Sequence, residues 1–268
     1  MRKQEYQQLK ISPQGRVGII TLCHPPRNSF SKQMITELLD ALSCYEEDEH
    51  IRVVLVNGEG PDFSKGADFT DLTAEISGGE NSKLTFSELG NQLVERIECC
   101  PKATVVAARG ECYGGSSAIF SAFDIRIVGE TFRIHDGDIY YGTVGSWGMS
   151  SLRLPIWIGR NKIMDYMFLN EGFTGHQAYE LGLVSKVVAD ELVEVTAVEI
   201  AQKMAKAAPI AVRYFKECVR TALYQDFQKA REFEQQASEI VYNTEDCKNG
   251  LHTLMSDENS PMCDFLGK

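Results

Sequence analysis

The sequence has little positive charge. Its 268 residues include 27 Lys and Arg against 38 Asp and Glu, which gives a formal net charge of −11 and a pI near 5.0. Proteins that bind nucleic acid or anionic membranes need a basic face, so we expect neither as a partner. This net charge does not exclude a small phosphorylated ligand, because such a ligand needs only local backbone amides and one or two cations.

Several other signals are missing. The eight cysteines form no C-x-x-C pair and no Cys/His ligand spacing, which argues against a metal site and a disulfide framework. No run approaches about 18 apolar residues, and the N-terminal segment has no apolar stretch of the signal-peptide kind. The G-x-S-x-G and G-x-G-x-x-G patterns of hydrolases and dinucleotide-binding proteins are also absent. We therefore expect a soluble cytoplasmic protein with reduced thiols.

The first part of the chain, up to about residue 108, alternates between strand-like and helix-like segments. Residues 17–22, 53–56 and 104–108 are short apolar runs rich in β-branched residues, typical of buried strands. Helical spacing of apolar residues separates them over 31–42 and 87–99. This alternation predicts an α/β fold with parallel strands and helical crossovers.

The remainder of the chain is helical after a last strand at 184–188. We accordingly divide it into an α/β core, residues 1–190, and a helical region, residues 191–268. The helical region carries more apolar side chains than a thin domain needs for its own packing. They include Val195, Val198, Ile200, Met204, Val212, Phe215, Val219 and Leu223. This surplus predicts an oligomer interface.

Two segments combine a buried strand, a glycine-containing turn and a helix start. The first runs from strand 53–56 to residues 63–69, and the second from strand 104–108 to residues 114–118. Ligands collect at the ends of strands in open α/β sheets, where the amides of a helix start are free to donate. Two such amides aimed at one carbonyl form an oxyanion hole, although a Gly-Gly pair alone is more often just a tight turn.

The two segments together resemble the crotonase (enoyl-CoA hydratase/isomerase) superfamily. Residues 63–69 are similar to its F-x-x-G-A-D segment, and 103–127 to its segment with G-x-x-x-G-G-G and a closing D-x-R-I. Residues 142–184 and 242–250 follow the order of its G-x-x-P, G-L-V and C-terminal F-x-S/T-x-D-x-x-E-G segments, with Gly145 in place of the proline. The resemblance implies a spiral of ββα units with a C-terminal helical trimerisation region. It also implies a homotrimer or dimer of trimers acting on a coenzyme A thioester, with no other cofactor.

The resemblance also assigns residues to roles. The backbone amides of Ala67 and Gly115 would be the oxyanion donors for the thioester carbonyl, and Asp138 the acid/base. The substrate and its coenzyme A portion would contact a larger set, comprising Arg27, Lys65, Gly66, Asp68, Gly114, Tyr140, Trp147, Tyr242 and Lys248. The hydroxyls of Tyr140 and Tyr141 could orient a substrate or donate a proton, but packing in the acyl pocket is the simpler interpretation for both.

The chain departs from the hydratase pattern at both catalytic positions, one of which lacks a carboxylate while the other has a shorter one. Hydratases of this family use two glutamates, and the position three residues after the oxyanion glycine is Ala118 here. The second position, four residues before Gly142, is Asp138. A single carboxylate can move a proton between two carbons, so we favour enoyl-CoA isomerisation over hydration. A decarboxylase, an acyl-CoA hydrolase and a catalytically silent acyl-CoA-binding homologue stay open as alternatives.

Overall fold

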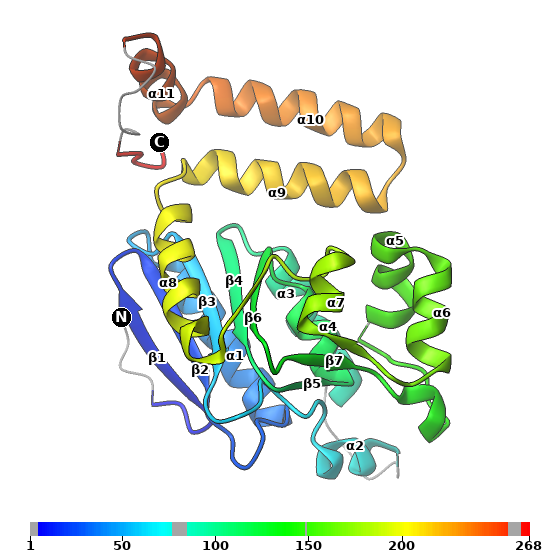
Figure 1. Ribbon diagram of the computed structural model, residues 1–268. Coiled ribbons are helices and arrows are strands. Elements are labelled where there is room, and N and C mark those ends of the chain that lie inside the picture. The colour runs from blue at the N-terminus through cyan, green and yellow to red at the C-terminus, as the bar shows by residue number, and fades with distance from the viewer. Residues whose placement is uncertain (1–4, 77–84, 148, 257–263) are drawn as a thin grey trace.

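A six-stranded sheet forms the centre of the molecule (Figure 1). The computed structural model describes residues 5–76, 85–147, 149–256 and 264–268. The strands in spatial order are β1 (Leu9–Gln14), β2 (Val17–Leu22), β3 (Val53–Gly58), β4 (Ala103–Ala108), β6 (Ile125–Gly129) and β9 (Lys186–Val188). Only β1 is antiparallel to its neighbour, so the carboxyl ends of β2, β3 and β4 lie at the same edge.

A second, smaller sheet follows β4. It consists of β5 (Glu111–Tyr113), β7 (Arg133–His135) and β8 (Phe173–Thr174), with β5 and β7 parallel. An isolated bridge between Ser64 and Cys112 joins the loop after β3 to β5. The segments that follow β3 and β4 are therefore held together by backbone pairing.

Helices cover both faces of the six-stranded sheet. The elements are α1 (Lys32–Glu47), α2 (Phe69–Ile76), α3 (Phe86–Glu98), α4 (Gly115–Ser121), η1 (Asp138–Tyr141), η2 (Met149–Arg153), α5 (Leu154–Ile158), α6 (Arg160–Phe168), α7 (Gly175–Glu180), η3 (Asp190–Leu192), α8 (Val193–Met204), α9 (Pro209–Tyr224), α10 (Phe227–Tyr242) and α11 (Glu245–Ser256). Successive residues of a strand point to opposite faces. Val54 and Val56 accordingly join the core shared with α1 and α3, whereas Val53 and Leu55 pack with α8.

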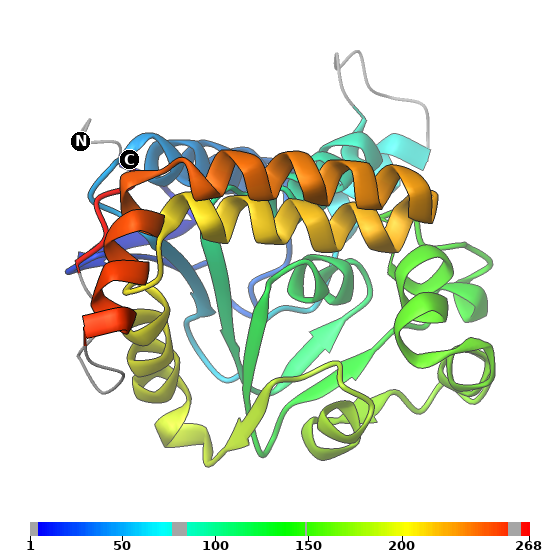
Figure 2. The ribbon, with the colours of Figure 1, turned by 90° about the horizontal axis from the view of Figure 1, so that it is seen from above.

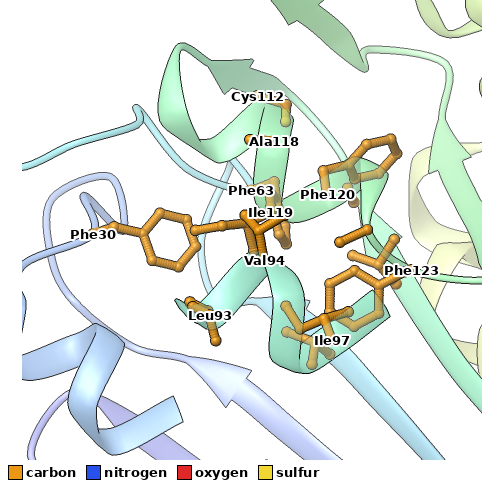
Figure 3. Packing of buried hydrophobic residues seen from close by; sticks show 14 of the residues in the cluster. Phe30, Phe63, Leu93, Val94, Ile97, Cys112, Ala118, Ile119, Phe120 and Phe123 are labelled. Atoms are coloured by element: carbon orange, nitrogen blue, oxygen red, sulfur yellow. The ribbon is translucent and has the colours of Figure 1, made fainter. Parts of the chain in front are cut away.

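The larger of the two hydrophobic cores holds the loop after β3 and the start of helix α4 in place. Phe63, just after β3, packs edge-on against Phe120 of α4, with ring centroids 5.9 Å apart (Figure 3). Ala118 and Ile119 of α4 belong to the same cluster, opposite Leu93 of α3. All five side chains are at most 2% exposed. Their burial fixes the positions of the loop after β3 and of helix α4.

Helices α9 and α10 lie side by side above the sheet and its covering helices in both views (Figures 1 and 2). Large apolar side chains remain exposed on this hairpin, among them Phe215, Val219, Leu223, Phe227 and Ile240. This is the surplus apolar surface expected from the sequence. Helix α8, which we assigned to the C-terminal region, instead covers the sheet through Val193, Ala197 and Ala201. In the described part of the chain, no helix combines the length and apolarity needed to cross a bilayer.

The predicted elements are confirmed with small shifts at their ends. Thr174 and Gln177 form a capping box at the start of α7. A second box, between Thr85 and Glu88, starts α3 one residue earlier than expected. The strand predicted over 184–188 begins only at Lys186. Strands β1, β5, β6, β7 and β8 were not predicted. Strands β5, β7 and β8 have only two or three residues, too few for a recognisable periodicity, and Pro13 within β1 argues against a strand.

Candidate active site

A cavity of about 250 Å³ opens where the loop after β3, the start of α4 and residues 136–147 meet. Its lining residues are Ala67, Leu72, Glu75, Phe86, Ser87, Gly114, Gly115, Ala118, Asp136, Asp138, Thr143, Val144, Gly145, Ser146 and Trp147. The structure thus brings together five of the residues predicted from the sequence: Ala67, Gly114, Gly115, Asp138 and Trp147.

The amide of Ala67 points away from Phe30. Ala67 forms a parallel bridge with Phe30, in which Phe30 N donates to Gly66 O at 2.8 Å and Asp68 N donates to Phe30 O at 2.9 Å. Because the bonds on either side of Ala67 serve that bridge, its own N–H points the other way. Gly66 has φ +88°, and a Cβ there would overlap the carbonyl oxygen of Tyr113 and lie 3.5 Å from Gly115 N. Only glycine allows this close approach.

The amide of Gly115 is the first of helix α4. A first-turn amide has no acceptor within its helix, which leaves it free to donate to a ligand. Gly114 precedes it with φ 53° and ψ −126°, and Gly114 N donates to His135 O at 2.8 Å. Among the described residues, neither Ala67 N nor Gly115 N donates to a protein acceptor. Two such amides on one cavity are a suitable pair of donors for a carbonyl oxygen.

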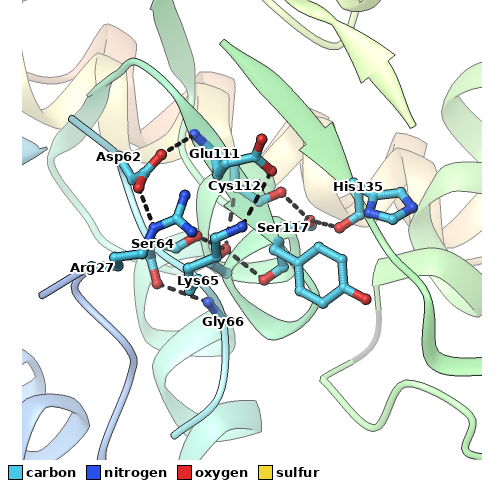
Figure 4. Close-up of polar contacts among 11 residues, drawn as sticks. Arg27, Asp62, Ser64, Lys65, Gly66, Glu111, Cys112, Ser117 and His135 are labelled. Atoms are coloured by element: carbon cyan, nitrogen blue, oxygen red, sulfur yellow. Dashed lines mark hydrogen bonds and ion pairs between the residues drawn. The ribbon is translucent and has the colours of Figure 1, made fainter. Parts of the chain in front are cut away.

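Two buried serines fix the start of α4. Ser117 Oγ lies 3.2 Å from both Cys112 O of β5 and His135 O of β7, so it connects these two strands of the small sheet (Figure 4). Ser116 Oγ donates to Tyr113 O at 2.7 Å. Both serines are fully buried. Only the place of these serines after the glycine pair could have pointed to this role in the sequence.

The structure places two carboxylates, Asp136 and Asp138, on the wall of the same cavity. Asp138 opens η1, and its amide donates to Asp136 Oδ1 at 3.1 Å. A Cβ on Gly145 would lie 2.6 Å from Asp138 Oδ2 and 3.9 Å from Asp136 Oδ2, so both carboxylates face this glycine. Burial, and secondarily the Asp136 charge, raises the pKa of Asp138 to about 6. Asp136 is 4% exposed, and the sequence reasoning passed over it.

The rest of the cavity wall is mainly apolar. Ala118 lies on α4 and is 2% exposed, so a methyl group stands at the first hydratase position. Trp147 is 5% exposed and packs edge-on against Phe86, with ring centroids 5.4 Å apart. Such a surface excludes water from a bound group and strengthens electrostatic interactions within the cavity.

The cations near the cavity already have acidic partners. Arg27 Nε lies 2.5 Å from Asp62 Oδ2, and Lys65 Nζ lies 3.7 Å from Glu111 Oε2 (Figure 4). Burial pushes the pKa of Asp62 up, but the bonds from Arg27 and from the Glu111 amide outweigh it and hold the pKa below its ordinary value. Both cations remain partly exposed. Their contact with a ligand phosphate stays a prediction.

Other predicted residues lie outside the cavity. Asp68 accepts a hydrogen bond from Thr70 N at 2.8 Å and so caps α2. Tyr140 is 59% exposed, and its hydroxyl donates to Phe168 O at 2.6 Å, which ties η1 to α6. Tyr242 and Lys248 are exposed on α10 and α11, and α11 lies far from α2 in both views (Figures 1 and 2). Any contact of these four residues with a ligand stays a prediction.

Comparison with known proteins gives a consistent result. The family model described as enoyl-CoA hydratase/isomerase matches residues 13–259. A Bacillus subtilis protein described as a probable enoyl-CoA hydratase is 30% identical over 240 residues, covering 89% of this chain and 92% of its own. The 1,2-epoxyphenylacetyl-CoA isomerase of Escherichia coli is 26% identical, covering 94% and 95%. The relatives therefore include proteins named for hydration and for isomerisation.

Solved structures agree with the sequence comparison. The crystal structure of a probable enoyl-CoA hydratase/isomerase from Mycobacterium abscessus superposes with a TM-score of 0.88 at 29% identity. It covers 98% of this chain and all of its own. The predicted crotonase-like fold is thereby confirmed.

Proposed function

Because the chain belongs to the enoyl-CoA hydratase/isomerase family, we propose that it isomerises the double bond of an enoyl-CoA thioester. Asp138 carries the proton, and the amides of Ala67 and Gly115 hold the thioester oxygen. The observation that carries the proposal is the cavity itself. It places two unpaired amides and a carboxylate of raised pKa together, with Ala118 where a second glutamate would stand.

The proton transfer follows from these groups. With the thioester oxygen on the two amides, the Asp138 carboxylate removes a proton from the α-carbon of a 3-enoyl-CoA. The electron pair moves into the conjugated enolate, and the negative charge on oxygen is stabilised by both N–H groups, each worth about 10²–10³ in rate. Asp138 then returns the proton to the γ-carbon, which yields the 2-enoyl-CoA. A base with a pKa near 6 is better suited to this than an ordinary aspartate.

Hydration of a 2-enoyl-CoA is a second candidate, and Asp136 is the observation that favours it. This carboxylate lines the same cavity as Asp138, although it stands on the 136–138 segment and not at position 118. One carboxylate could activate a water while the other donates a proton to the α-carbon. The relative described as a hydratase supports the same possibility.

The remaining contacts belong to the same proposal. Lys65 stands in the loop that leads to Ala67, and because both it and its partner Glu111 are partly exposed, exchanging that partner for a coenzyme A phosphate would cost little. Arg27 keeps its bond to the buried Asp62 and offers its remaining guanidinium N–H groups to a phosphate. The exposed apolar side chains of α9 and α10 support a homotrimer or a dimer of trimers. Light scattering of the purified protein tests the assembly: a monomer would contradict it.

The test of function is a thioester panel with matched variants. Conversion of 3-enoyl-CoA to 2-enoyl-CoA is followed by the absorbance of the conjugated thioester. We expect Asp138→Asn to lower the rate by about 10²–10⁴, since the proton carrier is lost. The control is Asp226→Asn, the same change at the N-cap of α10, where asparagine caps equally well.

Each outcome decides between the candidates. Full isomerase activity in Asp138→Asn would show that the base is assigned wrongly. Hydration by the wild type that is lost in Asp136→Asn would favour the second candidate. Release of CO₂ from a malonyl-type thioester would indicate a decarboxylase. Binding of acyl-CoA without turnover of any thioester would indicate a catalytically silent homologue.

A further inference from the structure

The indole of Trp147 spans the gap between α3 and the start of α4. Its pyrrole side lies against Gly90, where an added Cβ would overlap Cε2 and Nε1 of the indole. Its benzene side lies against Gly115, where an added Cβ would stand 2.6 Å from Cζ3 and 2.7 Å from Cε3. The indole therefore fills the space that two glycines leave free on facing helices.

Neighbouring contacts fix Trp147 in this place. Asn91 Nδ2 donates to the carbonyl oxygen of Ser146 at 2.6 Å, which ties the preceding residue to α3. Ser146 Oγ lies 3.2 Å from Ser87 Oγ of the same helix. The edge-on contact with Phe86 holds the ring from a third side. The indole is 5% exposed, packs against Phe86, Gly90 and Gly115, and follows a residue bound to α3, so it forms a fixed wall.

The position of this wall determines how far an acyl chain can extend. Trp147 touches Gly115, whose amide is one of the two donors for the thioester oxygen, so the wall stands next to the reacting end of the acyl group. The cavity of about 250 Å³ is smaller than the roughly 300–1,000 Å³ of typical ligand pockets. Phe86 and Leu72 line it as well, which leaves an apolar space of limited depth.

We propose that Trp147 limits the substrate to short, unbranched acyl groups by closing the passage between α3 and α4. This inference rests on the proposed acyl-CoA activity and adds the substrate class to it. Without the indole, the missing side chains of Gly90 and Gly115 would leave an apolar channel between the two helices. The chain-length preference would then move to longer acyl groups.

The test measures binding of saturated acyl-CoAs, which cannot isomerise. Titration calorimetry compares butyryl-CoA with octanoyl-CoA on the wild type and on Trp147→Ala. We expect the wild type to bind butyryl-CoA at least tenfold more tightly, and Trp147→Ala to shift this ratio toward octanoyl-CoA by at least tenfold. Trp157→Ala is the matched control. Trp157 is the other tryptophan of the chain, and it lies on α5, where it packs against Arg126 of β6. This variant should keep the wild-type ratio.

Two further variants keep the test decisive. Trp147→Phe retains an aromatic ring against Phe86 and should shift the ratio in the same direction by a smaller factor, even if the alanine variant fails to fold. Trp157→Phe leaves Trp147 as the single tryptophan, and saturating butyryl-CoA should change its fluorescence. Unchanged emission on binding would overturn the placement of the acyl group.

The outcomes separate this inference from the proposed function. If the wild type binds both acyl-CoAs equally, or if Trp147→Phe keeps the wild-type ratio, the inference is wrong while acyl-CoA binding stands. If butyryl-CoA binds selectively but no enoyl-CoA turns over, the wall is supported and the isomerase proposal fails. If no acyl-CoA binds, both are wrong.

Discussion

The acid limb of the pH–rate profile should report on Asp138 and move when Asp136 loses its charge. Asp138 acts as a base only when it is ionised, and its pKa is raised to about 6 by burial and by the neighbouring carboxylate. Activity should therefore fall as the pH drops through about 6. The decline approaches tenfold per pH unit, so that at pH 5 about one tenth of the Asp138 side chains are ionised.

The substitution Asp136→Asn removes the negative charge of Asp136, which is the smaller of the two causes of the raised Asp138 pKa. Asparagine still offers an oxygen to the Asp138 amide, which Asp136 Oδ1 now binds at 3.1 Å, so the local backbone should be kept. With the like charge gone, the pKa of Asp138 falls, but burial still holds it above its ordinary value of 3.8. At pH 5 the variant should retain a larger share of its plateau rate than the wild type, by up to about tenfold.

The assay is kcat/KM for isomerisation between pH 4.5 and 8 at constant ionic strength. Asp226→Asn serves again as the control and should leave the profile unchanged, since that side chain caps α10. An acid limb that stays in place in Asp136→Asn, or moves to higher pH, would refute the coupling of the two carboxylates. Loss of all turnover at every pH would instead assign Asp136 a direct part in the chemistry.

Three further predictions follow from the site and its support. Gly115→Pro and Gly115→Ala both place a Cβ against Trp147, but only proline removes the amide hydrogen, so kcat should be about 10²–10³ lower in the proline variant than in the alanine variant. Asp138→Asn should raise the free energy of unfolding at pH 8 by roughly 1–3 kcal/mol in urea titrations, because the folded protein buries an anion. That gain should fade as the pH falls from about 6 to 3.8, where the wild-type carboxyl is protonated in both states. Asn28→Ala should lower the free energy of unfolding by about 1–3 kcal/mol in the same titration, since the buried amide binds His24 N and Glu59 O.

The sequence could predict how the two amides come together. The β-branched runs of β3 and β4 identify buried strands, and parallel neighbours in a sheet end at the same edge. The segments that follow them must then meet, which is where Ala67 and Gly115 lie. Ala118, one turn into α4, could likewise be placed on the cavity wall from helical spacing.

The segment over 136–147 could not be predicted in the same way. It contains only the short helix η1 and irregular backbone, so no periodicity tells which side chains point inward. Asp136 lies in the cavity and Tyr140 lies outside it, although both are two residues from Asp138. Trp147 was expected in the acyl pocket, but its fit against Gly90 depends on helix α3, more than 50 residues earlier in the sequence.

The most direct test of the account is the carbonyl stretching frequency of a bound acyl-CoA labelled with ¹³C at the thioester carbon. Two amides that donate to the oxygen should polarise the bond, so we predict a lower frequency on binding than in water. Gly115→Pro should lose part of that shift while Gly115→Ala retains it. A carbonyl band that stays at its solution frequency in the bound complex would contradict the claim that Ala67 and Gly115 hold the thioester oxygen.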